Sequence, residues 1–109
     1  MNLASDDRLF IFWDGSFTFD PTTATSVEME VASPLGVETR HQMVWLEDAV
    51  PSGKNWTRKA RTVSRFCGSQ AVAGVDDTAL GAGNYTSKII VEVSDGQIVT
   101  GPTSPLVIQ

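Results

Sequence analysis

The stretch "ALGAGNYTSKIIVEVSDGQIVTGP", which covers residues 79–102, contains the clearest fold signal in the sequence. Within "TSKIIVEV", apolar residues such as Ile89 and Val91 recur at every second position, which is the period of a β-strand. The Asp95-Gly96 pair that follows is typical of a two-residue hairpin turn, because both turn positions require a positive φ. The stretch therefore predicts two antiparallel strands joined by a tight turn.

The same alternation occurs earlier in the chain. "TSVEMEVA" places Val27, Met29 and Val31 on one face of a strand. Glu28 and Glu30 fall on the other face, so this segment is predicted to be a half-buried strand. "HQMVWLE" is apolar on both faces, which predicts a central strand.

Glycines and prolines mark the ends of the predicted strands. The Asp14-Gly15 pair between "LFIFW" and "SFTF" predicts either a second hairpin or a kink within one bent edge strand. Pro102 and Pro105 have no N–H to donate, so the last strand should be broken or lie at an edge. Residues 68–83, rich in glycine and alanine, have the weakest pattern.

No window repeats apolar residues at helical spacing over three turns, so a long amphipathic helix is not expected. The pattern favours roughly seven antiparallel strands arranged as a β-sandwich. The length suits one domain with a single core, covering residues 1–109. Residues 1–7 are expected to be flexible.

Tyr85 lies at the entry to the most regular predicted strand, after the "LGAGN" segment. This position resembles the tyrosine corner of immunoglobulin-like and fibronectin type III-like β-sandwiches, in which the hydroxyl bonds backbone at the preceding corner. Trp45 stands where such sandwiches often carry a core tryptophan. The resemblance covers residues 25–108 and implies structural roles for Tyr85, Trp45, Leu80 and Gly83. An ordinary strand aromatic in another all-β fold is the alternative for Tyr85.

The cysteine pattern departs from that of antibody domains. Those domains carry a cysteine two residues after the tyrosine, where this chain has Ser87. Cys67 is the only cysteine, so no disulfide can form within the chain. The resemblance is therefore to the disulfide-free branch of the architecture, and it favours a reducing compartment or a fold that needs no bridge.

The composition excludes several classes of partner. Eight basic and thirteen acidic residues give a net charge of -5, so no nucleic-acid partner is expected. The opening "MNLASDDRLF" lacks the regions of a signal peptide, and the longest apolar runs are too short to cross a membrane. If Met1 is the natural start, we expect a protein made in the cytoplasm without a membrane partner.

The residues that usually carry catalysis are scarce. His41 is the only histidine and lies far along the chain from Cys67, so neither a nucleophile–base pair nor a zinc site is expected. The acidic pairs Asp6-Asp7, Glu47-Asp48 and Asp76-Asp77 lack the spacing of a calcium loop. We therefore predict no enzyme activity, no metal site and no cofactor.

A basic strip, "KNWTRKARTVSR" at residues 54–65, is the first candidate binding surface. It holds five of the eight basic residues together with Trp56. Strand alternation would place Trp56 and Arg58 on one face and Lys59 and Arg61 on the other. This split favours an acidic protein partner over single-stranded nucleic acid, and a solvated outer strand is the alternative.

The "RLFIFW" segment is the second candidate. Phe10, Phe12 and Trp13 stand in an unbroken apolar run, of which one face can enter the core. If the other face is exposed near a sheet edge, it indicates an interface for self-association or docking. Burial of both faces is the alternative.

These features predict a non-catalytic structural or binding module. Isolated immunoglobulin-like domains made in a cytoplasm resemble virion components, so the resemblance implies a bacteriophage capsid decoration or tail protein that docks on a capsid or tail protein. It leaves open whether the chain also forms a homo-oligomer. The alternative is an extracellular adhesion, receptor or glycan-binding domain that recognises a cell-surface protein or sugar. The patterns "NWT" and "NYT" at Asn55 and Asn84 would then be glycan acceptors.

Overall fold

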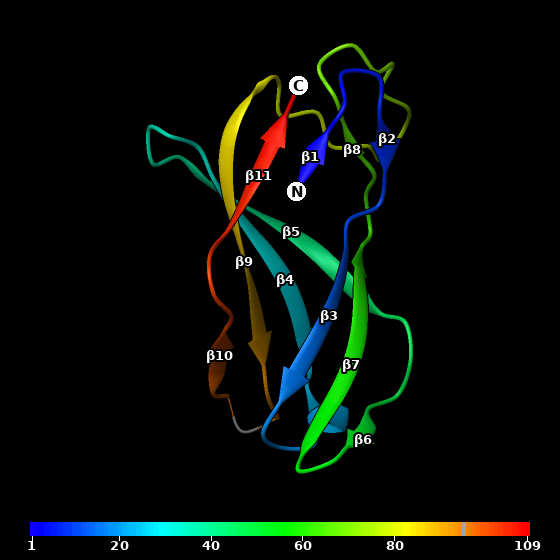
Figure 1. Cartoon of the computed structure of the whole chain (residues 1–109), viewed down its shortest axis with the longest axis vertical. Helices are drawn as coiled ribbons and strands as arrows, with labels where there is room; N and C mark the ends of the chain where they lie inside the picture. The colour runs from blue at the N-terminus through cyan, green and yellow to red at the C-terminus, as the bar shows by residue number, and fades with distance from the viewer. Residues whose placement is uncertain (95) are drawn as a thin grey trace.

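The computed structural model describes every residue except Asp95 (Figure 1). The described residues contain no α-helix, and no helix that could cross a membrane. The all-β prediction is confirmed. The elements in chain order are β1 (Asn2–Leu3), β2 (Arg8–Leu9), β3 (Phe12–Phe17), the 3-10 turn η1 (Pro21–Thr23), β4 (Ser26–Ala32), β5 (Glu38–Trp45), β6 (Val50–Ser52), β7 (Asn55–Thr62), β8 (Phe66–Cys67), β9 (Gly83–Glu92), β10 (Ile98–Thr100) and β11 (Ser104–Ile108).

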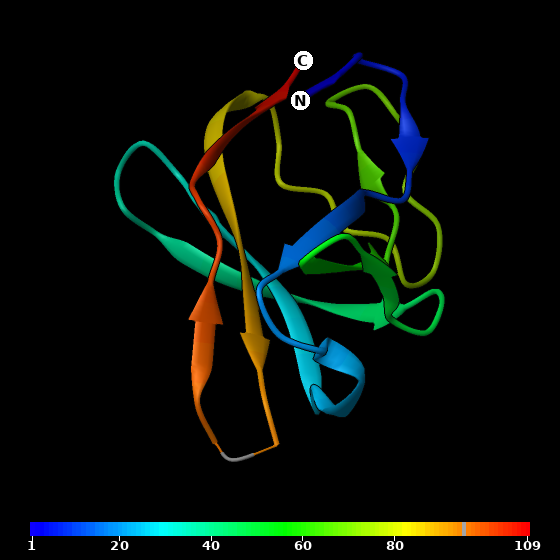
Figure 2. The ribbon, with the colours of Figure 1, turned by 60° about the horizontal axis from the view of Figure 1, so that its bottom comes forward.

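The strands form a curled mixed sheet with the shape of a half-barrel (Figures 1 and 2). Seven strands follow the order β1-β11-β9-β4-β5-β7-β3, while β10 pairs with β9 and β6 with β7. β2 and β8 pair separately. The prediction of about seven antiparallel strands is therefore only partly right, because β1 runs parallel to β11 and short strands extend the sheet.

β5 joins two arms of this sheet. It pairs with β4 over residues 38–42, and with β7 through residues 43–45. Because one strand belongs to both arms, the inner face of β3 and β7 turns toward the inner face of β4 and β9. The core between them consists of Leu3, Ile11, Phe17, Val27, Met29, Val31, Met43, Ala60, Phe66, Ile89, Val91 and Leu106.

The two strands predicted from "TSVEMEVA" and "HQMVWLE" are β4 and β5. Val27, Met29 and Val31 of β4 are buried, as predicted. β5 is central in the sheet order, but it is not buried on both faces. Met43 points into the core, whereas Val44 is 38% exposed, because no second layer covers the outward face of this strand.

The hairpin predicted after β9 joins β9 to β10, with Glu92 paired to Ile98. Asp95 lies outside the described residues. Gly96 has a φ of +82°, and its N–H donates to the Val93 carbonyl at 3.0 Å. Pro102 lies in the break between β10 and β11, as predicted for a chain that cannot continue the ladder there.

The hairpin alternative for Asp14-Gly15 is wrong, because β3 runs through both residues. Gly15 is buried and faces the same side as Trp13 and Phe17. A Cβ on Gly15 would lie 2.5 Å from the Trp13 ring and 2.7 Å from the Phe17 ring. These rings meet edge to face at 5.7 Å between centroids. The glycine therefore makes room for an aromatic contact and does not form a turn.

The chain end is also better held than the sequence suggests. We expected residues 1–7 to be flexible, but Leu3 is fully buried and pairs with Ile108. The Asp7 carbonyl accepts a hydrogen bond from Gly68 at 2.8 Å. Contacts with distant parts of the chain, invisible in the local pattern, hold this segment in place.

The glycine-rich segment between β8 and β9 is fixed by polar contacts. The Arg8 guanidinium bonds the Asp77 carboxylate, which also accepts the Gly74 N–H. The hydrogen bond from Arg8 is the main reason why the pKa of Asp77 is lowered. The Cys67 N–H donates to the Thr78 carbonyl at 3.0 Å. These bonds dock the segment against β2 and β8.

Tyr85 makes the contact that the tyrosine-corner resemblance implies. Its hydroxyl donates to the Leu80 carbonyl at 2.7 Å, and the Gly81 carbonyl lies 3.2 Å away. The ring packs against the core, as do Leu80 and Trp45. Gly83 lies beside the Tyr85 ring, where a Cβ would approach it at 3.3 Å. The contact closes the loop before β9.

We expect Gly15→Ala to destabilise the protein by roughly 1–3 kcal/mol, because the added methyl must displace the Trp13 or Phe17 ring. The free energy of unfolding from urea titrations measures this loss. Ser16→Ala, a change at the exposed neighbour, is the control and should stay within about 0.5 kcal/mol. Equal stability of the two variants would contradict the packing role of Gly15.

Tyr85→Phe should lower the free energy of unfolding by roughly 1 kcal/mol, because it removes the hydroxyl and leaves the Leu80 carbonyl without its donor. Thr86→Ala on the exposed side of the same strand serves as the control. A Tyr85→Phe protein that unfolds at the wild-type urea midpoint would show that this bond adds nothing to the fold.

Candidate docking surface

The outward faces of β3, β7 and β5 form one continuous surface. Phe12 on β3, Arg61 on β7 and Val44 on β5 lie in register across the three strands. Lys59, the next outward residue of β7, lies opposite Asp14. Phe12 is 63% exposed. We name as the β3–β7 surface the following residues: Phe10, Phe12, Val44, Lys59, Arg61, Val63 and Arg65.

Two guanidinium groups gather around Phe10 at one end of this surface. The Arg61 guanidinium carbon lies 4.0 Å from the Phe10 ring centroid, and that of Arg65 lies 5.0 Å away. Arg61 also donates to the Thr62 carbonyl at 2.9 Å. The negative face of the ring attracts both cations, so positive charge is held close to the exposed Phe12.

These cations form no close ion pair among the described residues, although Arg65 lies near enough to Asp77 to help Arg8 lower the pKa of that carboxylate. Lys59, Arg61 and Arg65 have no carboxylate within ion-pair distance among the described residues. On a chain of net charge -5, this surface is locally basic and partly apolar. It therefore has the composition of a protein-binding surface, in which cations and aromatic side chains lie together.

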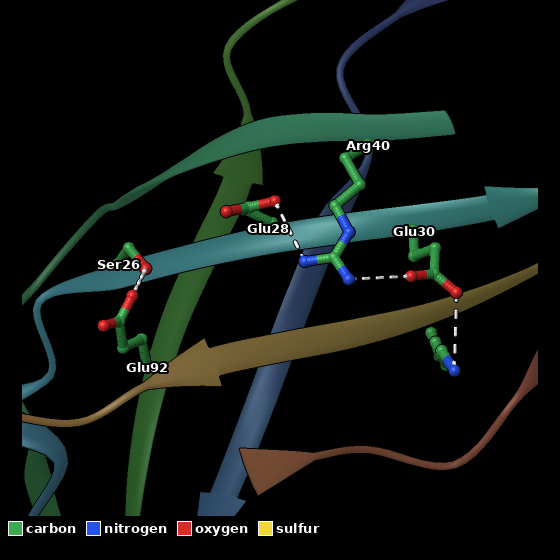
Figure 3. Close-up of polar contacts among 6 residues, drawn as sticks. Ser26, Glu28, Glu30, Arg40 and Glu92 are labelled. Atoms are coloured by element: carbon green, nitrogen blue, oxygen red, sulfur yellow. Dashed lines mark hydrogen bonds and ion pairs between the residues drawn. The ribbon is translucent and has the colours of Figure 1, made fainter. Parts of the chain in front are cut away.

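The outward face of β4, β5 and β9 is different (Figure 3). Arg40 lies 3.7 Å from Glu28 and 3.3 Å from Glu30, and Lys88 lies 3.4 Å from Glu30. Glu30 is only 7% exposed, and two cations balance its charge. The two cations of this face, Arg40 and Lys88, are thus paired with carboxylates, unlike the cations of the β3–β7 surface.

Arg58 does not belong to the docking surface. It is only 8% exposed, and its guanidinium donates to the carbonyls of Glu47 at 3.0 Å and Pro21 at 2.8 Å. It also stacks on Trp45, with 4.3 Å between the guanidinium carbon and the ring centroid. Arg58 therefore ties β7 to β5, to η1 and to the loop after β5, and is unavailable to a partner.

Trp13 and Trp56 also turn inward. Both pack against the core, and Trp13 lies 6.2 Å from Trp45 between ring centroids. The indole N–H of Trp45 is buried and has no hydrogen-bond partner among the residues that the structure describes. Of the binding residues predicted from the sequence, Phe10, Phe12, Lys59 and Arg61 lie together on the β3–β7 surface.

Sequence reasoning missed one member of this surface, Val44, whereas Val63 and Arg65 belong to the basic strip at residues 54–65. Strict alternation along β5 could have placed Val44 outward, opposite Met43. Val63 and Arg65 follow β7 and reach the surface only because Phe10 of a distant segment lies there. The contact with Phe10 cannot be predicted from a local sequence pattern.

The residues considered for catalysis are dispersed. The His41 ring lies 4.9 Å from Phe66 between centroids and 2.7 Å from the Thr39 hydroxyl, and burial lowers its pKa. Cys67 is buried. Among the described residues, no group of three or more His, Cys, Asp or Glu side chains is placed to hold a metal ion.

Comparisons with protein families, curated proteins and solved structures found no match for this chain.

We expect Arg58→Met to lower the free energy of unfolding by roughly 2–3 kcal/mol, because two buried carbonyls lose a charged donor. Lys59→Met, the same change at the next residue, should shift it by no more than about 0.5 kcal/mol. Urea unfolding of both variants provides the measurement. If Lys59→Met costs as much as Arg58→Met, the inward role of Arg58 is contradicted.

Proposed function

We propose that this chain is a non-catalytic β-sandwich module of the immunoglobulin-like or fibronectin type III-like kind that docks on another protein. The observation that carries the proposal is the β3–β7 surface, where Lys59, Arg61 and Arg65 lack carboxylate partners in the described chain and lie beside the exposed Phe12. A complementary partner presents carboxylates around an apolar contact.

Two features support the sandwich assignment. The Tyr85 hydroxyl reaches back to the Leu80 carbonyl, as in a tyrosine corner. The arms β3–β7 and β5-β4-β9-β11 enclose one core between them. β5 passes from one arm to the other, which accounts for the curled shape of the sheet.

We further propose that the module is a virion component, a capsid decoration or tail protein made in the host cytoplasm. Such a role requires no catalytic activity, cofactor or nucleic-acid contact. A symmetric lattice repeats the same acidic surface many times, so weak contacts at each copy add to a stable assembly. Assembly of the module as a homo-oligomer would also be compatible with such a symmetric lattice.

An extracellular adhesion or receptor domain is the second candidate. It is favoured by the exposure of Asn55 and Asn84, the two possible glycan acceptors. The packing of Trp56 against the core argues against the glycan-binding form of this candidate, because only part of the ring stays accessible to a sugar.

Density-gradient banding of virus particles tests the proposal. An antibody against the recombinant protein should detect the native chain in the particle band from cultures that encode it. Detection only outside the particles would overturn the virion role. N-linked glycans on the native protein would support the extracellular candidate instead.

Matched variants then test the surface. Arg61→Gln and Thr86→Glu each lower the net charge by one, but Thr86 lies on β9 away from the β3–β7 surface. When protein is added back to stripped particles, Arg61→Gln should bind roughly three- to tenfold more weakly, as expected for loss of one interfacial charge. Thr86→Glu should bind as the wild type does. Equal binding of both variants would exclude this surface.

A further inference from the structure

Three cavities lie along the open side of the half-barrel, two between β3 and the β9–β10–β11 strands and one between the segment after β3 and the β9–β10 hairpin. Their volumes are about 200, 410 and 240 Å³. The first two share Trp13, Ile89, Gly101 and Pro102, and the second and third share Val99. Because neighbouring cavities share lining residues, they form one groove, which we call the open-side groove.

The floor of this groove is apolar. Trp13 and Phe17 line it from β3, and Ile89 and Val91 line it from β9. The chain's own Met1 lines one end, where its amino group bonds the Pro105 carbonyl at 2.9 Å and β1 begins to pair with β11. One end of the groove is therefore occupied by the chain's own extended N-terminal segment, which pairs with β11.

One wall of the groove is a free strand edge. In the described structure β3 ends the sheet order and pairs only with β7. The Ile11 carbonyl accepts the Thr62 N–H at 2.9 Å, so the odd-numbered residues of β3 direct their backbone groups to β7. Phe12, Asp14 and Ser16 therefore direct their N–H and C=O groups to the open side.

We propose that the open-side groove accepts an extended segment of the partner protein, which adds to the edge of β3 as an antiparallel strand. Backbone hydrogen bonds to Phe12, Asp14 and Ser16 would hold it, and its alternate apolar side chains would enter the groove between Phe17 and Val91. This inference deepens the proposed function, on which it rests, by naming the form of the docking partner.

The charges along the β3 edge determine which charged side chains the partner segment should carry on its outward face. The middle of β3 carries Asp14, whereas the end at Phe12 lies beside Arg61 and Arg65, which gather over Phe10. Cross-strand neighbours of opposite charge attract, and like charges repel. The segment therefore carries a carboxylate opposite Phe12 and an amine opposite Asp14. Antiparallel pairing of two β3 edges centred on Asp14 would instead bring two carboxylates together.

A capped six-residue peptide, Thr-Val-Lys-Val-Glu-Val, has this pattern when it runs antiparallel to β3. Titration of the wild-type protein with this peptide, followed by amide NMR shifts, should give saturable changes at Phe12, Asp14 and Ser16 with a Kd below about 1 mM. The matched peptide Thr-Val-Glu-Val-Lys-Val has the same composition but exchanges the two charges. It should bind roughly three- to tenfold more weakly.

A backbone variant tests the edge itself. Ser16→Pro removes an N–H that faces the groove and no bond to β7, so the fold should persist while peptide affinity falls at least about threefold. Ser16→Ala is the control and should bind as the wild type does. Thermal unfolding of both variants confirms that they are folded.

Three results would overturn strand addition. They are no change in amide NMR shifts up to about 1 mM peptide, equal affinity for both peptides, and shift changes centred away from β3. The peptide titration and the particle experiment test different proposals. If the protein bands with particles but binds no peptide, docking stands and strand addition fails. If it binds the peptide but never bands with particles, the groove accepts a strand and the virion role fails.

Discussion

The rest of the structure depends on the position of β5, which belongs to both arms of the sheet. Its first residues pair with β4 and its last three with β7, so the sheet must curl at this strand. The curl brings Phe17 and Ala60 of one arm against Met29 and Val91 of the other. Burial of these side chains is the main source of stability, and Arg58 fastens the bend by joining β7 to two neighbouring segments.

The same curl leaves one side of the molecule open. β3 ends the sheet order beyond β7 and β10 pairs with β9, and neither is joined to the other by a ladder among the described residues. An unpaired strand edge presents backbone donors and acceptors to which another strand can pair. The β3–β7 surface lies next to this edge, so under the proposed docking mode charge and backbone would act on the same partner.

Local patterns predicted much of the fold. The alternation in β4 and β9, the hairpin after β9 and the break at Pro102 could all be predicted, since each depends on residues within a few positions of one another. The role of Gly15 was predicted wrongly, because the local sequence does not distinguish a glycine in a turn from one that makes room for the rings of Trp13 and Phe17. β1 was missed, because its pairing partner lies at the other end of the chain.

The candidate surface was predicted in part. Phe10, Phe12, Lys59 and Arg61 were predicted in two separate segments, and these segments meet on one face only because β3 pairs with β7. The role of Arg58 could not be predicted, because alternation gives the face of a strand and not which face is covered. The sequence by itself determined the alternating strands such as β4 and β9, the turn between β9 and β10, and the excess of acidic over basic residues. Only the tertiary structure decided which cations are buried, which lack a carboxylate and which edge stays free, because each of these depends on contacts between distant residues.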